Sequence, residues 1–318
     1  MVWLRYLIWL SAAGPALAAP APPDTLRPLS PVRELTYAYA NDLFFRTDYY
    51  FTQGMRLTLQ HPALAQLPTR HLLAAGPVGS TQQFGIALRY DGFTPLRIQD
   101  AFIRVGDRPY AAYLYASFFR TVTTPVRQLT TALEIGFIGP AAGGRELQTF
   151  LHRITGNAAP RGWQYQVGNA PVLAYRARLA RRLAAAPGRA ELTGHAEAVL
   201  GTLYTHATAG LNLRAGHFAS NFQLPATAGR SRWQLAGQAG LAARAVGYNA
   251  TLQGNLFGAK DPYTLASRDV ARVVWRSTGG LVLAHGNLRL AATATWISPE
   301  FAGGRAHRWG ELALTVGL

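Results

Sequence analysis

About a dozen segments of the chain alternate apolar and polar residues, and this alternation constrains the fold more than any other feature. Successive side chains of a strand point to opposite faces, so the pattern predicts strands with one apolar and one polar face. Strands of about ten residues joined by turns are typical of an antiparallel transmembrane barrel, whereas sandwich strands are usually shorter. We therefore predict an all-β fold, an antiparallel transmembrane β-barrel of about twelve strands over residues 32–318. The segments are 34–42, 50–61, 81–91, 109–122, 128–139, 170–183, 191–204, 210–218, 232–246, 270–286, 287–297 and 311–318.

The beginning of the sequence predicts export. Residues 1–18 contain Arg5, an apolar run and a small-residue ending at Ala18, which is the pattern of a cleaved secretory signal peptide. Residues 19–31 are rich in proline and predict an extended lead-in. No cysteine is present, so disulfides and thiolate chemistry are excluded. We expect the outer membrane of a Gram-negative bacterium as the location.

Aromatic residues gather near the ends of several predicted strands. Tyr113 and Tyr115 belong to one such group, and Trp296 lies near the end of a late segment. In outer-membrane barrels, aromatic side chains form girdles at both membrane interfaces. We expect these residues to contribute to a girdle.

The chain carries a formal net charge of +16 at pH 7, almost wholly from arginine. A charge of this size favours an anionic partner such as a phosphate-bearing lipid. The alternative is a compositional bias that spreads arginine over loops and the barrel lumen. Nucleic acid is not an expected partner, because the protein is expected to be exported.

Residues 140–164 interrupt the alternating pattern and predict a short helical insert. Gly143 and Gly144 open it, residues 145–154 form the helix, and residues 156–160 close it. Gln148 and His152 are four residues apart, so they share one face of this helix. A histidine is more often structural than catalytic, but His152 lies on a polar helix inserted between strands. We identify it as a candidate general base acting on water.

Asn41 and Asp42 end the first predicted strand, where they would lie at the barrel rim. Carboxylate and amide oxygens are ligands that Ca²⁺ selects, and a zinc site would need more His or Cys. Asp48 and the hydroxyl groups of Thr47 and Thr52 lie in the same hairpin. The alternative for Asn41 and Asp42 is a plain Asx-turn with a solvated carboxylate.

Arg108 precedes the fourth strand and is a candidate for a charge-assisted contact with a phosphate or sugar. Its neighbour Asp107 offers the alternative of a surface ion pair. The chain has no Gly-x-Ser-x-Gly, His-Glu-x-x-His, Walker or Rossmann pattern. Classical serine hydrolases and zinc proteases are therefore excluded.

These motifs together resemble the lipid A deacylase family of outer-membrane barrels, which removes the 3′ acyloxyacyl group of lipid A. The resemblance covers nearly the whole mature chain. It rests on Asn41-Asp42-x-x-x-x-Thr47-Asp48-x-Tyr50-x-Thr52-x-Gly54, on Asp107-Arg108-Pro109-Tyr110-Ala111, on Gly143-Gly144-x-x-x-Gln148-x-x-x-His152-x-x-x-Gly156 and on Tyr248-Asn249-x-x-Leu252-Gln253-Gly254-Asn255.

The resemblance implies a twelve-stranded barrel with a calcium-dependent site near the rim of the outer leaflet. It implies that His152 activates water, that Asn41 and Asp42 arrange the metal and the oxyanion, and that Thr52 and Gln148 complete the pocket. The family also carries a glutamate shortly after the histidine, and residues 155–160 of this chain contain no acid. The arginines that would meet the lipid phosphate are matched only loosely, by Arg97, Arg104 and Arg108.

Two functions follow as hypotheses. The first is a Ca²⁺-dependent esterase acting on lipid A or a related outer-leaflet glycolipid, present as a monomer in the membrane. The second is a non-catalytic outer-membrane barrel that serves as a pore or as a glycolipid-binding structural protein.

Overall fold

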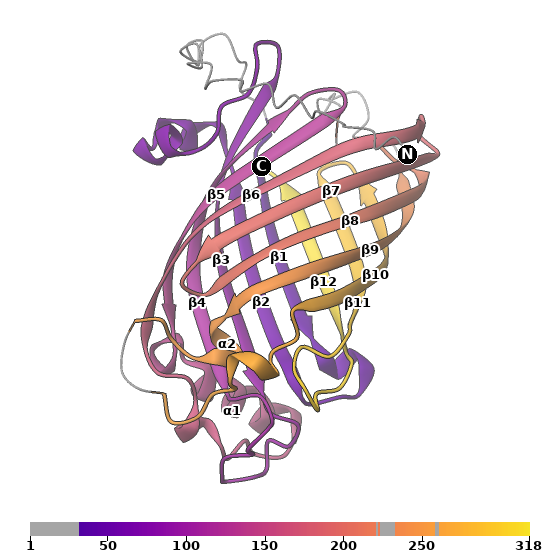
Figure 1. The fold of residues 1–318 in the computed structure, drawn as a ribbon. Coiled ribbons are helices and arrows are strands. Elements are labelled where there is room, and N and C mark those ends of the chain that lie inside the picture. The colour runs from indigo at the N-terminus through magenta and orange to yellow at the C-terminus, as the bar shows by residue number, and fades with distance from the viewer. Residues whose placement is uncertain (1–31, 221, 223–232, 258–260) are drawn as a thin grey trace, which may run out of the picture.

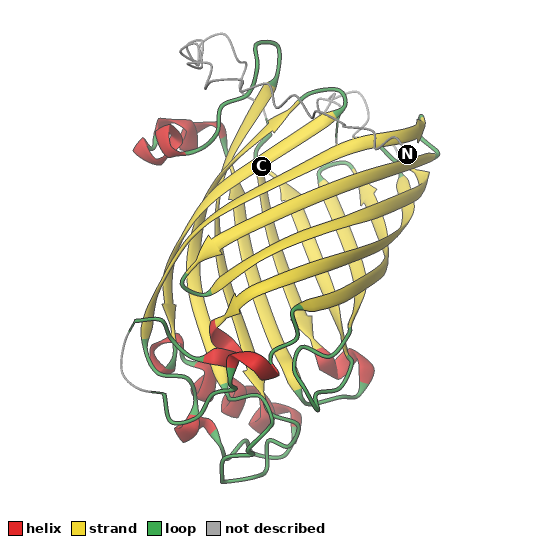
Figure 2. Cartoon of the chain, in the orientation of Figure 1, coloured by secondary structure: helices red, strands yellow, loops and turns green. Residues whose placement is uncertain are grey.

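The computed structural model describes residues 32–220, 222, 233–257 and 261–318. The predicted signal peptide (1–18) and lead-in (19–31) lie outside these residues. Twelve antiparallel strands form a closed barrel in which each strand pairs with its neighbours in sequence and β12 pairs with β1 (Figures 1 and 2). The strands are β1 Glu34–Asn41, β2 Tyr50–Gln60, β3 Thr81–Thr94, β4 Ala111–Thr123, β5 Arg127–Ile138, β6 Ala170–Ala186, β7 Ala190–Gly201, β8 Tyr204–His217, β9 Gln234–Asn249, β10 Val273–His285, β11 Leu288–Ile297 and β12 His307–Gly317.

The predicted fold class is confirmed, and each predicted segment overlaps one strand. The largest difference in bounds concerns β8, which begins at Tyr204 although we placed its start at residue 210. Thr202 and Leu203 make the turn before it. Because this tight turn contains neither proline nor glycine, the alternating pattern runs through it without a visible break.

The outer surface of the barrel is apolar, and the inner surface is polar. Leucines and tryptophans on alternate strand positions are exposed, as expected for side chains that face lipid. Examples from around the barrel are Leu57, Leu88, Leu173, Leu211, Leu241, Trp275, Leu290 and Leu312. In the part of the chain that the structure describes, no helix is long and apolar enough to cross a membrane.

The expected aromatic girdle is wrong for Tyr113 and Tyr115. Their side chains are 2% and 5% exposed and line the lumen, where the Tyr113 hydroxyl donates a hydrogen bond to Asp91. Both occupy inward positions of β4. Because alternate positions of a strand face opposite sides of the sheet, position in the strand and not residue type determines which side a residue faces. Trp296 is 40% exposed, as a girdle residue should be.

The two ends of the barrel differ in their connections. The end opposite the first residue of β1 and the last residue of β12 carries α1 Gly144–Thr155, α2 Ala250–Gln253 and the short helix η2 Asp42–Phe45 (Figure 1). A buried apolar cluster that includes several aromatic rings lies inside the barrel at this end. It includes Phe51, Phe93, Tyr113, Val167 and Leu203, with Trp309 packed against it. We call this cluster the aromatic layer, and the α1 end of the barrel the rim.

Candidate active site

Helix α1 confirms the predicted insert and packs one narrow face against the barrel. Its buried residues, Gly144, Gln148 and His152, are spaced by four and lie in one row. A Cβ at Gly144 would lie 2.6 Å from Ala112 Cβ and from the ring of Trp163. Only glycine therefore lets the first turn of α1 approach the wall this closely.

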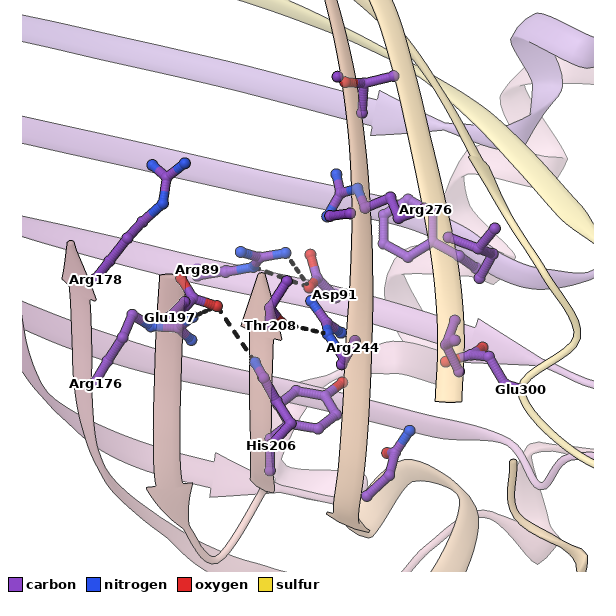
Figure 3. Close-up of a pocket in the computed structure, with 18 of the residues that line it drawn as sticks. Arg89, Asp91, Arg176, Arg178, Glu197, His206, Thr208, Arg244, Arg276 and Glu300 are labelled. Atoms are coloured by element: carbon purple, nitrogen blue, oxygen red, sulfur yellow. Dashed lines mark hydrogen bonds and ion pairs between the residues drawn. The ribbon is translucent and has the colours of Figure 1, made fainter. Parts of the chain in front are cut away.

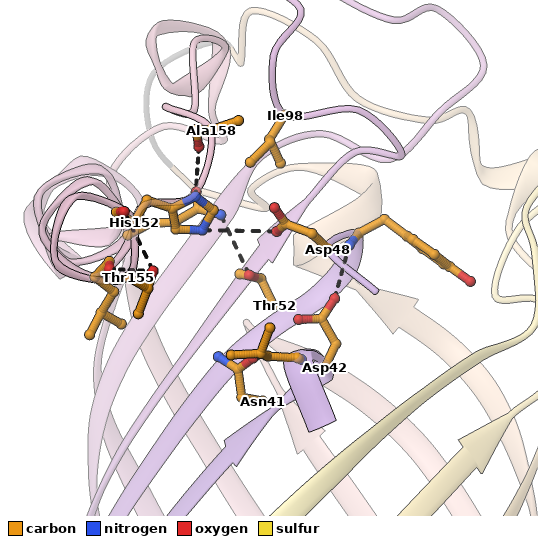
Figure 4. A network of polar contacts seen from close by, with 12 residues as sticks. Asn41, Asp42, Asp48, Thr52, Ile98, His152, Thr155 and Ala158 are labelled. Carbon is orange, nitrogen blue, oxygen red and sulfur yellow. Dashed lines mark hydrogen bonds and ion pairs between the residues drawn. The ribbon is translucent and has the colours of Figure 1, made fainter. Parts of the chain in front are cut away.

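Gln148 is fully buried and joins the helix to the barrel. Its Oε1 accepts a hydrogen bond of 2.6 Å from Nε1 of Trp163. An indole nitrogen only donates, so this contact fixes which end of the amide is oxygen. Nε2 of Gln148 then faces the hydroxyl of Thr52 on β2, at 3.5 Å (Figure 4). The structure thus brings Thr52 and Gln148 together.

The loop that follows α1 selects the tautomer of a neutral His152. Gly156 has left-handed backbone angles and ends the helix, which turns the chain back over its last turn. The carbonyl oxygen of Ala158 then lies 2.7 Å from Nδ1 of His152. A carbonyl oxygen only accepts, so Nδ1 carries the proton and the lone pair is on Nε2. That nitrogen lies 4.0 Å from Oδ1 of Asp48 (Figure 4).

Asn41 ends β1 and caps η2. Its Oδ1 accepts a hydrogen bond of 2.7 Å from the Leu43 amide, and its Nδ2 donates to the Tyr39 hydroxyl at 2.9 Å. The turn chemistry that we weighed as an alternative is therefore present. Oδ1 keeps a second lone pair, so the cap does not prevent this oxygen from binding a cation.

Asp42 is only 2% exposed, and its Oδ2 accepts a hydrogen bond of 2.9 Å from the Tyr49 amide. Burial raises the pKa of Asp42 from 3.8 to about 8, and the nearby charge of Asp48 adds to the rise. Burial also raises the pKa of Asp48, while the charge of His152 opposes that rise. Burial thus favours the neutral form of Asp42, whereas a charged His152 helps to keep Asp48 ionised.

The side chains around Asn41 and Asp42 offer oxygen atoms, which Ca²⁺ prefers, but few of these oxygens belong to carboxylates. Within the described residues, no group of three or more His, Cys, Asp or Glu side chains could hold a metal. The available atoms are oxygens, from Asp42, Asn41 and the neighbouring backbone, and hard oxygen ligands are what calcium takes. A cation bound to Asp42 would also offset the burial of its carboxylate.

The three candidate phosphate-binding arginines lie apart from this group. Arg108 is 1% exposed, and its guanidinium contacts Glu300 at 3.0 Å and Thr251 at 2.9 Å. Arg104 is paired with Asp100 at 2.5 Å. Only Arg97 keeps a mostly exposed side chain, at 65%.

Comparisons with known proteins decide the family. Residues 4–318 match the family model described as "Outer membrane protein LpxR". The chain belongs to the LpxR family. This confirms the lipid A deacylase family that we recognised from the sequence, and with the barrel fold it supports the outer membrane as the location.

A solved structure shares this barrel fold. LpxR from Salmonella typhimurium is 19% identical, covers 90% of this chain and 100% of its own, and superposes with a TM-score of 0.73. The β domain of the Bordetella autotransporter BrkA is 13% identical over 90% of this chain and 99% of its own, with a TM-score of 0.46. No curated protein matches the chain.

Two side chains of the site had no assigned role in our reading of the sequence. Asp48 was noted in the hairpin, but nothing in the sequence links it to His152 in a helix far along the chain. Trp163 follows the helix in a Gly-Trp pair, and its role in orienting Gln148 appears only from the packing.

Proposed function

We propose that this LpxR-family protein hydrolyses an acyl ester of lipid A, the 3′ acyloxyacyl linkage, with His152 as general base. One observation carries the proposal: the Ala158 carbonyl holds His152 in the tautomer whose Nε2 is free to accept a proton. Family membership supports the reaction class.

The chemistry begins with a water between His152 and Asp48. Their 4.0 Å separation is too long for a direct hydrogen bond, and it is a distance that one water can bridge. Nε2 takes a proton from this water as its oxygen attacks the ester carbonyl. The resulting imidazolium is stabilised by Asp48 on one side and by the Ala158 carbonyl on the other.

The tetrahedral intermediate then collapses. The bond between the acyl carbon and the sugar oxygen breaks, and His152 returns its proton to that oxygen. The products are a free fatty acid and a lipid A hydroxyl group. Thr52 and Gln148 hold α1 against β2, and thereby keep His152 at a fixed distance from the hairpin that carries Asp48.

We propose Ca²⁺ as the cofactor, held by Asp42 together with Asn41. When bound, this ion would polarise the ester carbonyl and stabilise the developing oxyanion. Asp42 supports this role because its carboxylate is buried and next to a second carboxylate.

The outer side of α1 supports a lipid substrate. Phe150 and Ile154 are four residues apart and are 48% and 61% exposed, on a helix beside an apolar barrel wall. These side chains can contact acyl chains of the outer leaflet. Arg97, whose Nε lies 3.9 Å from Asp100 on a 65% exposed side chain, is the arginine placed to meet a lipid phosphate.

The test is His152→Ala, with His217→Ala as its matched control. His217 is an exposed histidine at the end of β8 farthest from the rim. Loss of a general base lowers the rate by roughly 10²- to 10⁴-fold. We expect that loss in His152→Ala only, with both barrels folded. If His152→Ala releases acyl chains at the parent rate, the assignment of the base is wrong; if the parent releases none, the protein is the non-catalytic barrel.

A further inference from the structure

The lumen contains a cavity of about 470 Å³, bounded toward the rim by residues of the aromatic layer (Figure 3). Six arginines and three acidic residues line it, so positive charge is in excess. They are Arg56, Arg89, Arg176, Arg178, Arg244 and Arg276, and Asp91, Glu197 and Glu300.

Every acid of the cavity wall is already paired. Each of the three carboxylates lies within 3.0 Å of an arginine. Arg56, which also lines the cavity, pairs with Glu311. The pairs are Arg89 with Asp91 at 2.9 Å, Arg176 with Glu197 at 3.0 Å, Arg108 with Glu300 at 3.0 Å, and Arg56 with Glu311 at 3.4 Å.

Three arginines of the wall remain without an acid. Within the described residues, no carboxylate oxygen lies within 4.0 Å of Arg178, Arg244 or Arg276. The hydrogen bonds of Arg244 and Arg276 to the hydroxyls of Thr208 and Thr295 are long, at 3.4 Å. The guanidinium of Arg276 also lies over the ring of Trp309, 5.7 Å from its centroid, a contact that leaves its N–H groups free to meet an anion. Arg276 is exposed to solvent although it faces the lumen.

Strand register brings these guanidinium groups to one cavity. Arg244 on β9 lies opposite Val274 on β10, and Arg276 is two residues farther along, so the two arginines are diagonal neighbours on the inner face. Arg178 on β6 lies opposite Glu197. The Glu197 carboxylate, however, contacts Arg176 and His206 (Figure 3).

Three cations around one cavity repel each other, and the protein walls beside them screen that repulsion less than bulk water alone does. A multiply charged anion removes the repulsion, and the planar guanidinium fork matches phosphate oxygens. We propose that the lumen holds a binding site for a small, multiply charged phosphate-type oxyanion, formed by Arg178, Arg244 and Arg276. This site is separate from the proposed lipid A hydrolysis.

The position of the cavity favours a soluble anion over a lipid headgroup. Its wall consists of inward-facing strand residues, among them six arginines, and such a charged lining suits a soluble anion better than acyl chains. Its volume lies within the range of small-molecule sites. The anion also accounts for part of the positive charge noted in the sequence.

The experiment is isothermal titration of the refolded protein in detergent with pyrophosphate, at constant ionic strength set by chloride. We expect saturable binding that weakens by about tenfold or more in Arg276→Gln and in Arg244→Gln, because each loses a charge-assisted contact. Arg289→Gln is the matched control, because Arg289 is a β11 arginine outside the cavity that is paired with Glu34 at 3.3 Å.

Absence of saturable binding to the parent protein would overturn the proposal. Equal affinity in the parent, Arg276→Gln and Arg289→Gln would also overturn it, since the anion would then bind elsewhere. If either cavity variant fails to fold, Arg178→Gln provides the same comparison. The readout is affinity alone, so the result does not depend on lipid A hydrolysis.

Discussion

Asp42→Asn is predicted to make the metal-free barrel more stable at high pH while removing its activity. The pKa of Asp42 is raised from 3.8 to about 8. Between these values the folded protein keeps a proton that the unfolded chain has released, so stability falls as pH rises from about 4 to 8. A rise in the pKa of about four units corresponds to a loss of about 5 kcal/mol in the free energy of unfolding. Water that enters around the ionised carboxylate reduces the expected loss to about 2 to 5 kcal/mol.

Asparagine keeps the acceptor for the Tyr49 amide but cannot ionise. In chelator at pH 9, the free energy of unfolding of Asp42→Asn should therefore exceed that of the parent by this amount, and near pH 4 the two should be equal. The assay is urea unfolding in detergent micelles, followed by tryptophan fluorescence. Asp269→Asn, at a more exposed carboxylate, is the control and should change little.

Saturating Ca²⁺ should reduce the difference at pH 9, because the ion stabilises the parent and not the variant. The reasoning is refuted if the parent and Asp42→Asn show the same stability at pH 4 and pH 9.

Three further substitutions test the site and its support. Asp48→Asn should lower kcat about tenfold or more and change its pH profile, because the imidazolium of His152 loses its countercharge; an unchanged profile would remove Asp48 from the mechanism. Gly144→Ala should reduce activity without unfolding the barrel, because the added Cβ displaces α1 from its contact with Ala112 and Trp163. Full activity in this variant would show that catalysis does not require this close packing of α1. Arg108→Met should lower stability by about 3 kcal/mol in urea unfolding, because a carboxylate partly buried against it loses its partner; a larger effect on KM than on stability would instead place Arg108 at the substrate.

Local pattern predicted most of the barrel and the helix. Alternation along a strand reports which residues share a face, so the twelve segments could be placed without tertiary information. The spacing of Gln148 and His152 predicted their shared face on α1 in the same way. The turn at residues 202–203 was missed because no residue there interrupts the alternation.

Contacts between distant segments could not be predicted by these means. The approach of Asp48 to His152 depends on how α1 sits on the wall, and that position depends on the packing of Gly144 against Trp163. The burial of Arg108 likewise depends on Glu300, which lies in another loop. A motif shows which residue types are present, and packing decides which of them meet.

Release of an acyl chain from lipid A through a calcium site at the rim is tested most directly by mass spectrometry of lipid A. The lipid is incubated with the refolded protein in detergent, once with Ca²⁺ and once with chelator. We expect loss of one acyloxyacyl unit with Ca²⁺ and no loss with chelator. Unchanged lipid A mass in both conditions, with the folded barrel verified, would contradict the account.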